Sequence, residues 1–253
     1  GTYAVTITDA NNCSFIDSVV VTEPAAVVAN LTVLSNETCP NSADGQITID
    51  GSFFSYTWSN GQTSDTATGL AAGNYTVTVA NSNGCQSVGA ASIVIADSTN
   101  PTVQVQNIIV YLDANGAASI TTADIDNGSS DNCSIDSLSL DVTNFACADT
   151  GSNTVTLTAV DVNGNSASST ATVTVLDTLN PTVQVQNIIV YLDANGAASI
   201  TTADIDNGSS DNCSIDSLRL DITNFACADT GSNTVTLTAV DVNGNSASQT
   251  ATV

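Results

Sequence analysis

The stretch Thr154-Val155-Thr156-Leu157-Thr158-Ala159-Val160 places an apolar side chain at every second position, between threonines. Such alternation is typical of a β-strand with one face buried and the other in solvent. An Asn163-Gly164 dipeptide, which favours a tight hairpin, follows, and residues 170–175 then repeat the alternation. These residues therefore predict an antiparallel hairpin with a single buried face.

Units of this kind recur along the chain. Residues 101–173 and 181–253 match with a shift of 80. They are joined by Asp177-Thr-Leu-Asn180-Pro181, and a similar junction, Asp97-Ser-Thr-Asn100-Pro101, opens the first copy. Regular short strands with turn dipeptides and no helical period predict an all-β chain of tandem immunoglobulin-like antiparallel β-sandwich domains, arranged as beads on a string. Only three pairs of positions differ between the copies: Ser139/Arg219, Val142/Ile222 and Ser169/Gln249.

Four segments follow from these matches. Residues 1–24 match the end of the next unit with a shift of 72, so we expect the C-terminal part of a truncated repeat. Residues 25–97 form a complete repeat of the same type. Residues 98–177 are the first copy of the 80-residue unit, and residues 178–253 are the second copy, truncated at its C-terminus.

The first strand of each copy changes phase. Val103 and Val105 are in phase with each other, whereas Ile108, Val110 and Leu112 follow the opposite parity. A strand that reverses its inward face in this way is expected to bend and to change sheets. The sequence therefore predicts a kink at Asn107.

The charge of the chain excludes several classes of partner. Its 25 acidic residues and single basic residue, Arg219, give a net charge of −24. A nucleic-acid phosphate binder needs clustered Lys and Arg, and docking to an anionic membrane surface needs the same. No apolar run approaches the ~20 residues of a membrane span, and the first residues lack the features of a signal peptide. We expect export and anchoring signals to lie elsewhere.

Catalysis is not expected. The chain has no histidine and no lysine, so a serine nucleophile would lack an ordinary general base. Paired carboxylates can cleave glycosides, but no acidic pair stands apart from the turns in which these residues occur. We therefore expect a protein that is not an enzyme.

Seven cysteines without histidine or a Cys-x-x-Cys pair argue against zinc and thioredoxin-type sites. Widely spaced cysteines in strand-rich modules indicate disulfides and an extracellular location, at a cell surface or secreted. We expect one disulfide within each repeat, with the partner of Cys13 outside this chain. The predicted pairs are Cys39–Cys85, Cys133–Cys147 and Cys213–Cys227.

Aromatic residues alternate with polar ones at Phe54, Tyr56 and Trp58, which predicts one strand face. Trp58 has two interpretations: a core residue between two sheets, or an exposed platform on which a sugar stacks. A buried Trp58 would favour a structural stalk. An exposed pair of Tyr56 and Trp58 would favour a carbohydrate-binding module.

Clustered Asp and Asn residues make calcium the candidate cofactor, because calcium takes six to eight oxygen ligands. In an immunoglobulin-like sandwich, the incoming linker, the loop between the second and third strands and the final hairpin share one pole. The alternative is that the same side chains cap their own turns without a metal. The first copy offers Asp97, Asn100, Asp124, Asp126, Asp131, Asp161, Asn163 and Asn165. The second offers Asp177, Asn180, Asp204, Asp206, Asp211, Asp241, Asn243 and Asn245.

Two families share motifs with this chain. Gly73-Asn-Tyr-Thr-Val-Thr-Val and Asn81-Ser-Asn-Gly-Cys85 resemble the SprB repeat of a large surface adhesin of gliding Bacteroidetes. Asp131-Asn132-Cys133 and Asp161-Val-Asn-Gly-Asn165 resemble the hyalin (HYR-like) repeats of similar secreted proteins, although the second cysteine is placed differently. The resemblance implies a surface adhesin that is exported by the type IX pathway.

The same bacterial group attaches O-glycans at Asp-Ser/Thr-apolar motifs, which this chain resembles at five positions. An intact mass equal to the bare 25.5 kDa would exclude this modification. The acceptor hydroxyls would be those of Ser18, Thr66, Ser137, Thr178 and Ser217.

Together these observations predict a structural stalk or filament segment of a giant extracellular adhesin, which mediates surface attachment or gliding. Its expected partners are the neighbouring repeats of the same chain, calcium between modules, laterally associated copies, and a surface or glycan ligand that the sequence does not identify. The alternative is a ligand- or carbohydrate-binding module of a secreted multidomain protein.

Overall fold

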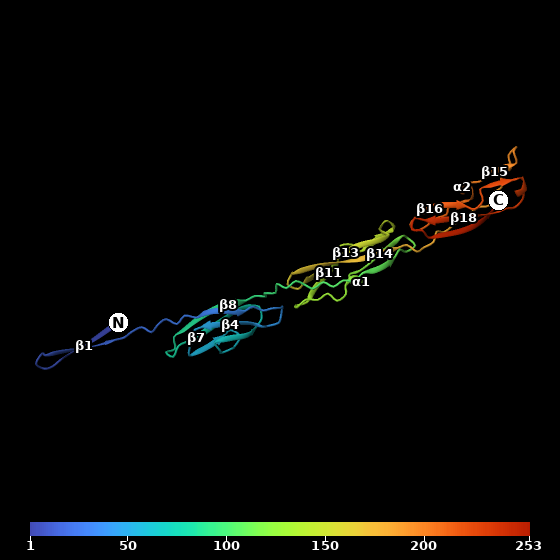
Figure 1. The fold of residues 1–253 in the computed structure, drawn as a ribbon. Helices are drawn as coiled ribbons and strands as arrows, with labels where there is room; N and C mark the ends of the chain where they lie inside the picture. Colours follow the sequence, from blue (N-terminus) through green and yellow to red (C-terminus); the bar gives the residue numbers. More distant parts are fainter. The chain divides into compact units, whose positions relative to one another are not determined.

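The computed structural model describes residues 1–253 (Figure 1). The chain divides into two compact units, Gly1–Asp97 and Ser98–Val253. Its regular structure consists of 19 strands, with only two one-turn α-helices and two 3-10 turns. The predicted all-β, immunoglobulin-like class is confirmed. The finer boundaries after residues 24 and 177 stay predictions.

The first unit begins with an exposed hairpin. Strands β1 (Thr2–Thr8) and β2 (Ser14–Val20) pair in antiparallel register, and every residue of both strands is exposed. The turn between them is closed by Asp9, whose Oδ1 accepts hydrogen bonds from the backbone N–H groups of Asn11 and Cys13. The hairpin is thus held by its ladder and its turn, with no core of its own.

The rest of the first unit is a sandwich of two three-stranded sheets. One contains β3 (Asn30–Ser35), β4 (Gly45–Asp50) and β6 (Thr66–Leu70); the other contains β5 (Ser55–Trp58), β7 (Gly73–Ala80) and β8 (Gln86–Ile93). Alternate residues of both sheets face each other, as the sequence predicts. The core contains Ile47, Ile49, Trp58, Ala67, Leu70, Val77, Val79 and Ile93.

Trp58 is a core residue. Only 2% of it is exposed, and its Nε1–H donates to the carbonyl oxygen of Ser64 at 2.8 Å. Tyr56 is half-buried, and its hydroxyl accepts the N–H of Phe53. The prediction that Phe54 shares their face is wrong: it is 79% exposed, because a bend precedes β5 and turns it outward. These residues do not form an exposed aromatic platform.

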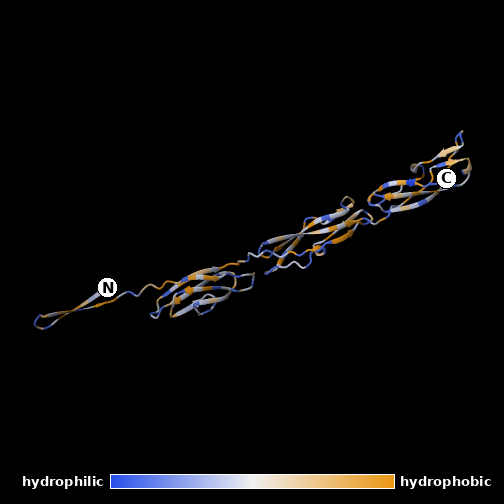
Figure 2. Ribbon diagram, viewed as in Figure 1, coloured by the Kyte–Doolittle hydropathy of each residue, from blue (hydrophilic) through white to orange (hydrophobic).

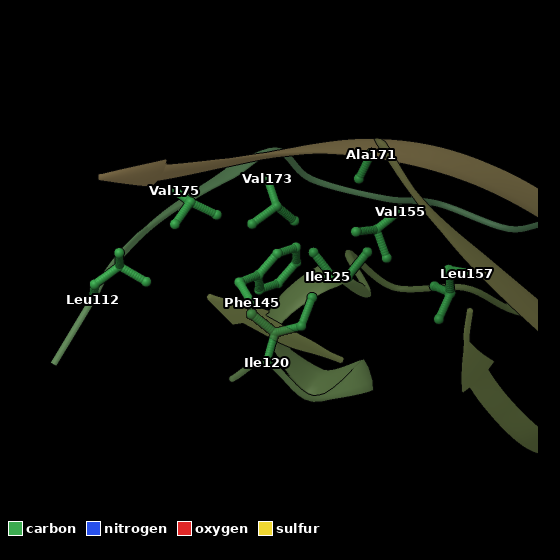
Figure 3. Packing of buried hydrophobic residues seen from close by; sticks show 9 residues of the cluster. All are labelled: Leu112, Ile120, Ile125, Phe145, Val155, Leu157, Ala171, Val173 and Val175. Carbon is green, nitrogen blue, oxygen red and sulfur yellow. The ribbon is translucent and has the colours of Figure 1, made fainter. Parts of the chain in front are cut away.

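In the second unit, the first copy packs a four-stranded sheet against a short pair of strands. The sheet order is β11 (Ile135–Leu140), β13 (Gly151–Asp161), β14 (Ser166–Leu176) and β9 (Ile108–Tyr111). The pair is β10 (Ala117–Ser119) and β12 (Asn144–Ala146). Figure 3 shows the interior, where Val155, Val173 and Phe145 lie together. The predicted burial of Val155, Leu157 and Ala159 is confirmed.

The predicted kink at Asn107 is also confirmed. Before it, Thr102 and Val105 form antiparallel bridges with Ser130 and Asp126. After it, β9 pairs in parallel with β14 in the other sheet. The side-chain oxygen of Asn107 accepts the N–H of Thr172 at 2.8 Å and so fixes the point at which the chain crosses.

The second copy repeats this arrangement in β15 (Ala197–Ser199), β16 (Ile215–Leu220), β17 (Asn224–Ala226), β18 (Thr234–Asp241) and β19 (Ser246–Thr252). Figure 2 shows hydrophobic and hydrophilic residues alternating along the strands. One difference is that residues 188–191, the counterpart of β9, are not a strand. In the first copy, β9 pairs with Val173–Leu176. Of these four residues, only Val173 has a counterpart in the second copy, which is Val253.

A carboxylate closes the loop after β3. The hydroxyl and N–H of Thr38 and the hydroxyl of Ser42 all donate to Asp44. The hydrogen bond from the Thr38 hydroxyl is the largest of the effects that lower the pKa of Asp44 to about 2. Since this pKa lies below that of an unfolded aspartate, about 3.9, the contribution of Asp44 to stability is present above pH 4. It is lost as the pH falls towards 2.

We expect Asp44→Asn to lower the melting temperature of the first unit at pH 7, because the amide cannot accept all of these hydrogen bonds as a charged group. The difference from the wild type should shrink as the pH falls from 4 to 2. Circular dichroism melts across this range measure it, with Glu23→Gln in the exposed segment before β3 as the control. A difference that stays constant down to pH 2 would contradict this role of Asp44.

Candidate metal centre at the junction of the two copies

Asp177 is the first carboxylate of the candidate metal centre. It follows β14 directly, at the start of the segment that leads into the second copy, and only 9% of it is exposed. Its Oδ1 accepts hydrogen bonds from the N–H of Leu179 at 3.1 Å and from Nδ2 of Asn212 at 3.2 Å. Its Oδ2 is buried and has no hydrogen-bond partner. One oxygen is therefore fixed while the other is left available to a ligand.

Asp211 repeats this division of roles from the loop before β16. Its Oδ2 accepts the N–H groups of Cys213 at 2.9 Å and Ser214 at 3.3 Å. Its Oδ1 is buried and has no hydrogen-bond partner. The side-chain oxygen of the next residue, Asn212, is also buried without a partner. Two further oxygen donors thus come from adjacent residues.

Asp241 is the third carboxylate and ends β18, where only 2% of it is exposed. Its Oδ1 accepts the N–H groups of Asn243 and Asn245, at 2.9 and 2.8 Å. Its Oδ2 accepts a hydrogen bond from Nδ2 of Asn245. The same Nδ2 also donates to the carbonyl oxygen of Asp177 at 3.3 Å. The final hairpin is thereby tied to the linker.

Carboxylate oxygens of Asp177, Asp211 and Asp241 all lie within 4.8 Å of one another. At that distance, and with an effective dielectric constant of about 20, each pair of charges repels by about 3 kcal/mol. Three pairs then cost about 10 kcal/mol, which is comparable to the total stability of a typical domain. The charge of this cluster therefore has to be compensated.

No basic side chain does this. The one basic residue of the chain, Arg219, is exposed on β16, four positions from Ile215, which pairs with Asp241. That separation is about 13 Å along the strand. What the site offers instead is a set of hard oxygen donors, three of them buried without a hydrogen-bond partner, which suits a calcium ion. The residues present fit the predicted metal.

The other predicted ligands of the second copy divide into two groups. Asn180 lines a polar hollow together with Asp211 and Asn212, and Asn243 follows Asp241 with its side-chain nitrogen buried and unpartnered. Asp204 and Asp206 do not join the carboxylate cluster. Asp204 accepts hydrogen bonds from the hydroxyl and the N–H of Thr201 and so caps α2 (Thr202–Ile205). Asp206 accepts a hydrogen bond from the N–H of Ser209.

The pKa values of these two carboxyls reflect capping. The Thr201 side chain, followed by its backbone N–H, lowers the pKa of Asp204. The Ser209 side chain likewise lowers the pKa of Asp206. The first copy has equivalent contacts beside its helix α1 (Thr122–Ile125). Asp124 accepts a hydrogen bond from the N–H of Thr121, and Asp126 accepts one from the N–H of Ser129. For these four residues the observed contacts are those of turn capping.

The first copy repeats part of the cluster. Asp131 accepts the N–H of Cys133 with Oδ2, and its Oδ1 is buried without a hydrogen-bond partner. Burial raises the pKa of Asp161, but hydrogen bonds from Asn165, Asn163 and Gly164 outweigh it and lower the pKa. The side-chain oxygen of Asn163 is buried and unpartnered. Metal ligation by Asp97 and Asn100 stays a prediction.

A disulfide joins the two copies beside the carboxylate cluster. Cys147, at the start of the 3-10 turn η1 (Cys147–Asp149), is bonded to Cys213, with their Cα atoms 5.3 Å apart. Cys39 and Cys133 are also disulfide-bonded, whereas Cys13, Cys85 and Cys227 are free thiols. The predicted pairs Cys39–Cys85, Cys133–Cys147 and Cys213–Cys227 are therefore wrong.

Strand length explains why the predicted pairs do not form. Cys133 precedes the six-residue strand β11 and Cys147 follows it, so the strand places them about 20 Å apart along the sandwich. The Cα atoms of disulfide-bonded cysteines are less than about 7 Å apart. The same holds in the first unit. Cys85 precedes the eight residues of β8, and Glu37, near Cys39, forms its bridge with Ile95 beyond the other end of that strand. The cysteines of these predicted pairs therefore lie at opposite ends of a sandwich.

The turn after β9 in the first copy contacts the Asp211–Cys213 segment of the second copy. Asp113 Oδ1 accepts the N–H groups of Asn115 and Ala117, and its carbonyl oxygen accepts Nδ2 of Asn212 at 3.3 Å. Gly116 has φ of +72°, and a Cβ there would lie 2.5 Å from Cys147 Sγ and 2.8 Å from the Asn212 carbonyl oxygen. This turn of the first copy therefore contacts the second copy.

Asn212 and Glu37 were not predicted. Asn212 stands between Asp211 and Cys213. Its position next to a predicted ligand and a cysteine was the one feature of the sequence that could have indicated its role. Glu37 is only 2% exposed, and its carboxylate accepts the N–H groups of Ala43 at 2.9 Å and Ala72 at 2.7 Å. It joins two loops of the first unit. Nothing in its sequence context marks it as a buried residue.

Comparisons with known proteins give fold-level likeness only. No family model matches the chain, and no curated protein does. Among solved structures, protocadherin gamma B2 extracellular cadherin domains 3–6 match with 15% identity and a TM-score of 0.30, over 99% of this chain and 82% of that one. A Ca2+-stabilised adhesin that helps an Antarctic bacterium bind ice matches with 17% identity and a TM-score of 0.31, over 99% and 80%.

A third match is to fibronectin(III)-like modules of CbhA from Clostridium thermocellum, with 14% identity and a TM-score of 0.25, over 58% of this chain and 95% of that one. The two α-helices, α1 and α2, have four residues each, so neither could span a membrane.

The disulfide assignment predicts that alkylation of the unfolded, unreduced chain will modify three of its seven cysteines, namely Cys13, Cys85 and Cys227. Peptide mapping without reduction should recover a peptide pair joined through Cys147 and Cys213. A pair joined through Cys133 and Cys147 would instead support the original assignment. Mapping after reduction, with all seven cysteines alkylated, is the control.

Proposed function

We propose that this chain is a stalk segment of an extracellular adhesin, in which calcium at the junction between successive sandwiches keeps them from bending. The observation that carries the proposal is the cluster of Asp177 and Asp241, which are buried, with the half-buried Asp211. Its three members come from the linker, from a loop and from the last hairpin, so a bound cation would hold all three together.

The position of the cluster fits a mechanical role. Asp177 lies at the end of the last strand of the first copy, whereas Asp211 and Asp241 belong to the second. Without a cation, their repulsion pushes the linker away from the domain that follows it. With a divalent cation, the same three charges attract a common centre and stiffen the linker.

Several finer features belong to the same proposal. The resemblance to gliding adhesins suggests a role in surface attachment or gliding, and lateral association of copies would bundle the stalks. Of the proposed O-glycan acceptors, Ser18, Ser137 and Thr178 are exposed. Thr66 and Ser217 are half-buried, and the Thr66 hydroxyl is 3.0 Å from that of Thr48. The carbohydrate-binding alternative loses its proposed platform because Trp58 is in the core.

We expect calcium to bind the 253-residue chain and to raise its melting temperature, because binding favours the folded state. Isothermal calorimetry should show that Asp177→Asn removes one class of site, since the amide removes one charge and one anionic oxygen. Asp216→Asn, at an exposed position of β16, is the matched control and should leave binding unchanged. Absence of binding at millimolar calcium would end the metal proposal.

The stalk itself is tested on the native particle by electron microscopy. We expect a beaded filament in calcium, and more strongly bent junctions between beads after chelation. A compact globular particle in both conditions would contradict a stalk. Beads joined by equally straight junctions with and without chelator would retain the stalk but contradict the role of calcium.

A further inference from the structure

The disulfide and the candidate metal centre share one segment of three residues, Asp211-Asn212-Cys213. Cys213 is covalently bonded to Cys147 of the first copy. Asp211 accepts the N–H of Cys213 through Oδ2 and offers Oδ1 to the metal centre. The bond that joins the copies is therefore two residues from a candidate ligand and is connected to it by a backbone hydrogen bond.

Asn212 connects the same segment to both sides of the junction. Its Nδ2 donates to the carbonyl oxygen of Asp113 in the first copy and to Oδ1 of Asp177 in the linker, at 3.3 and 3.2 Å. Its own carbonyl oxygen lies 3.5 Å from Sγ of Cys147. The disulfide thus holds the segment against the turn formed by Asp113 and Gly116, which is where Asn212 orients Asp177.

From this arrangement we infer that Cys147 and Cys213 are positioning residues for the metal centre, so that calcium affinity depends on whether their disulfide is formed. This inference rests on the proposed function. With the bond intact, Asp211 and Asn212 are already placed beside Asp177. With the bond broken, calcium has to order that segment against the first copy, and part of its binding free energy is used to do so.

Thermodynamic linkage makes the effect reciprocal: calcium must favour the disulfide by the same factor by which the disulfide favours calcium. Reduction by dithiothreitol breaks one S–S bond and places two electrons and two protons on the two sulfurs. The dithiothreitol is oxidised to its cyclic disulfide. Calcium should therefore make the Cys147–Cys213 bond harder to reduce, and the junction would lock most firmly where calcium and an oxidising environment coincide.

The first test is a calcium titration of the full chain by calorimetry, scored on the class of site that Asp177→Asn removes. We expect Cys147→Ser/Cys213→Ser to weaken that site by about tenfold or more, within the usual range of coupling between sites. The control is Cys13→Ser/Cys85→Ser/Cys227→Ser, which removes only free thiols and should bind as the wild type does. Equal affinity in the two variants would overturn the inference.

The second test needs no substitution and so does not depend on the folding of a variant. The wild-type chain is equilibrated in dithiothreitol redox buffers with calcium or with chelator, and the Cys147–Cys213 peptide pair is quantified after alkylation. A tenfold coupling moves the midpoint potential by about 30 mV in the reducing direction when calcium is present. An unchanged midpoint would overturn the inference while calcium binding to the oxidised chain still supported the proposed function. No binding to the oxidised chain would overturn both.

Discussion

Electrostatic repulsion among Asp177, Asp211 and Asp241 is the constraint around which the junction of the two copies is built. Two of these carboxylates are buried and the third, Asp211, is half-buried, and their oxygens lie within 4.8 Å of one another, so a compensating charge stabilises them. The surrounding hydrogen bonds fix one oxygen of Asp177 and one of Asp211, and leave the other oxygen of each unpartnered. The arrangement is that of a candidate metal site in which two carboxylate oxygens are left without a hydrogen-bond partner.

The sandwiches supply the rigidity that such a site requires. Asp177 and Asp241 directly follow or end long strands whose alternate residues are buried, so their positions are set by the cores of the two copies. Asp211 lies in a loop, directly after Ser210, which forms an antiparallel bridge with Thr182. On its other side, the disulfide between Cys213 and Cys147 and the contacts of Asn212 hold the loop. Each candidate ligand is thus fixed by a different physical means.

The predicted ligands of the second copy illustrate why acidic clusters in a sequence overstate metal sites. Asp204 and Asp211 both stand in an acidic, serine-rich loop, yet Asp204 uses its carboxylate to cap the helix that begins at Thr202. Asp211 turns one oxygen away from its own loop towards Asp177 and Asp241. Spacing along the chain does not distinguish them, because an Asp in such a loop can either cap a neighbouring turn or bind a metal.

Alternation of apolar residues by itself determined the strands, the buried faces of β13 and β14, the kink at Asn107 and the immunoglobulin-like class, because these follow from local side-chain periodicity. That the linker, the loop and the hairpin bring their carboxylates together was also predictable from their order in a sandwich. The cysteine pairing was decided only by the tertiary structure. A strand between two cysteines places them at opposite ends of one domain, so Cys213 bonds to Cys147 of the preceding copy rather than to the nearer Cys227.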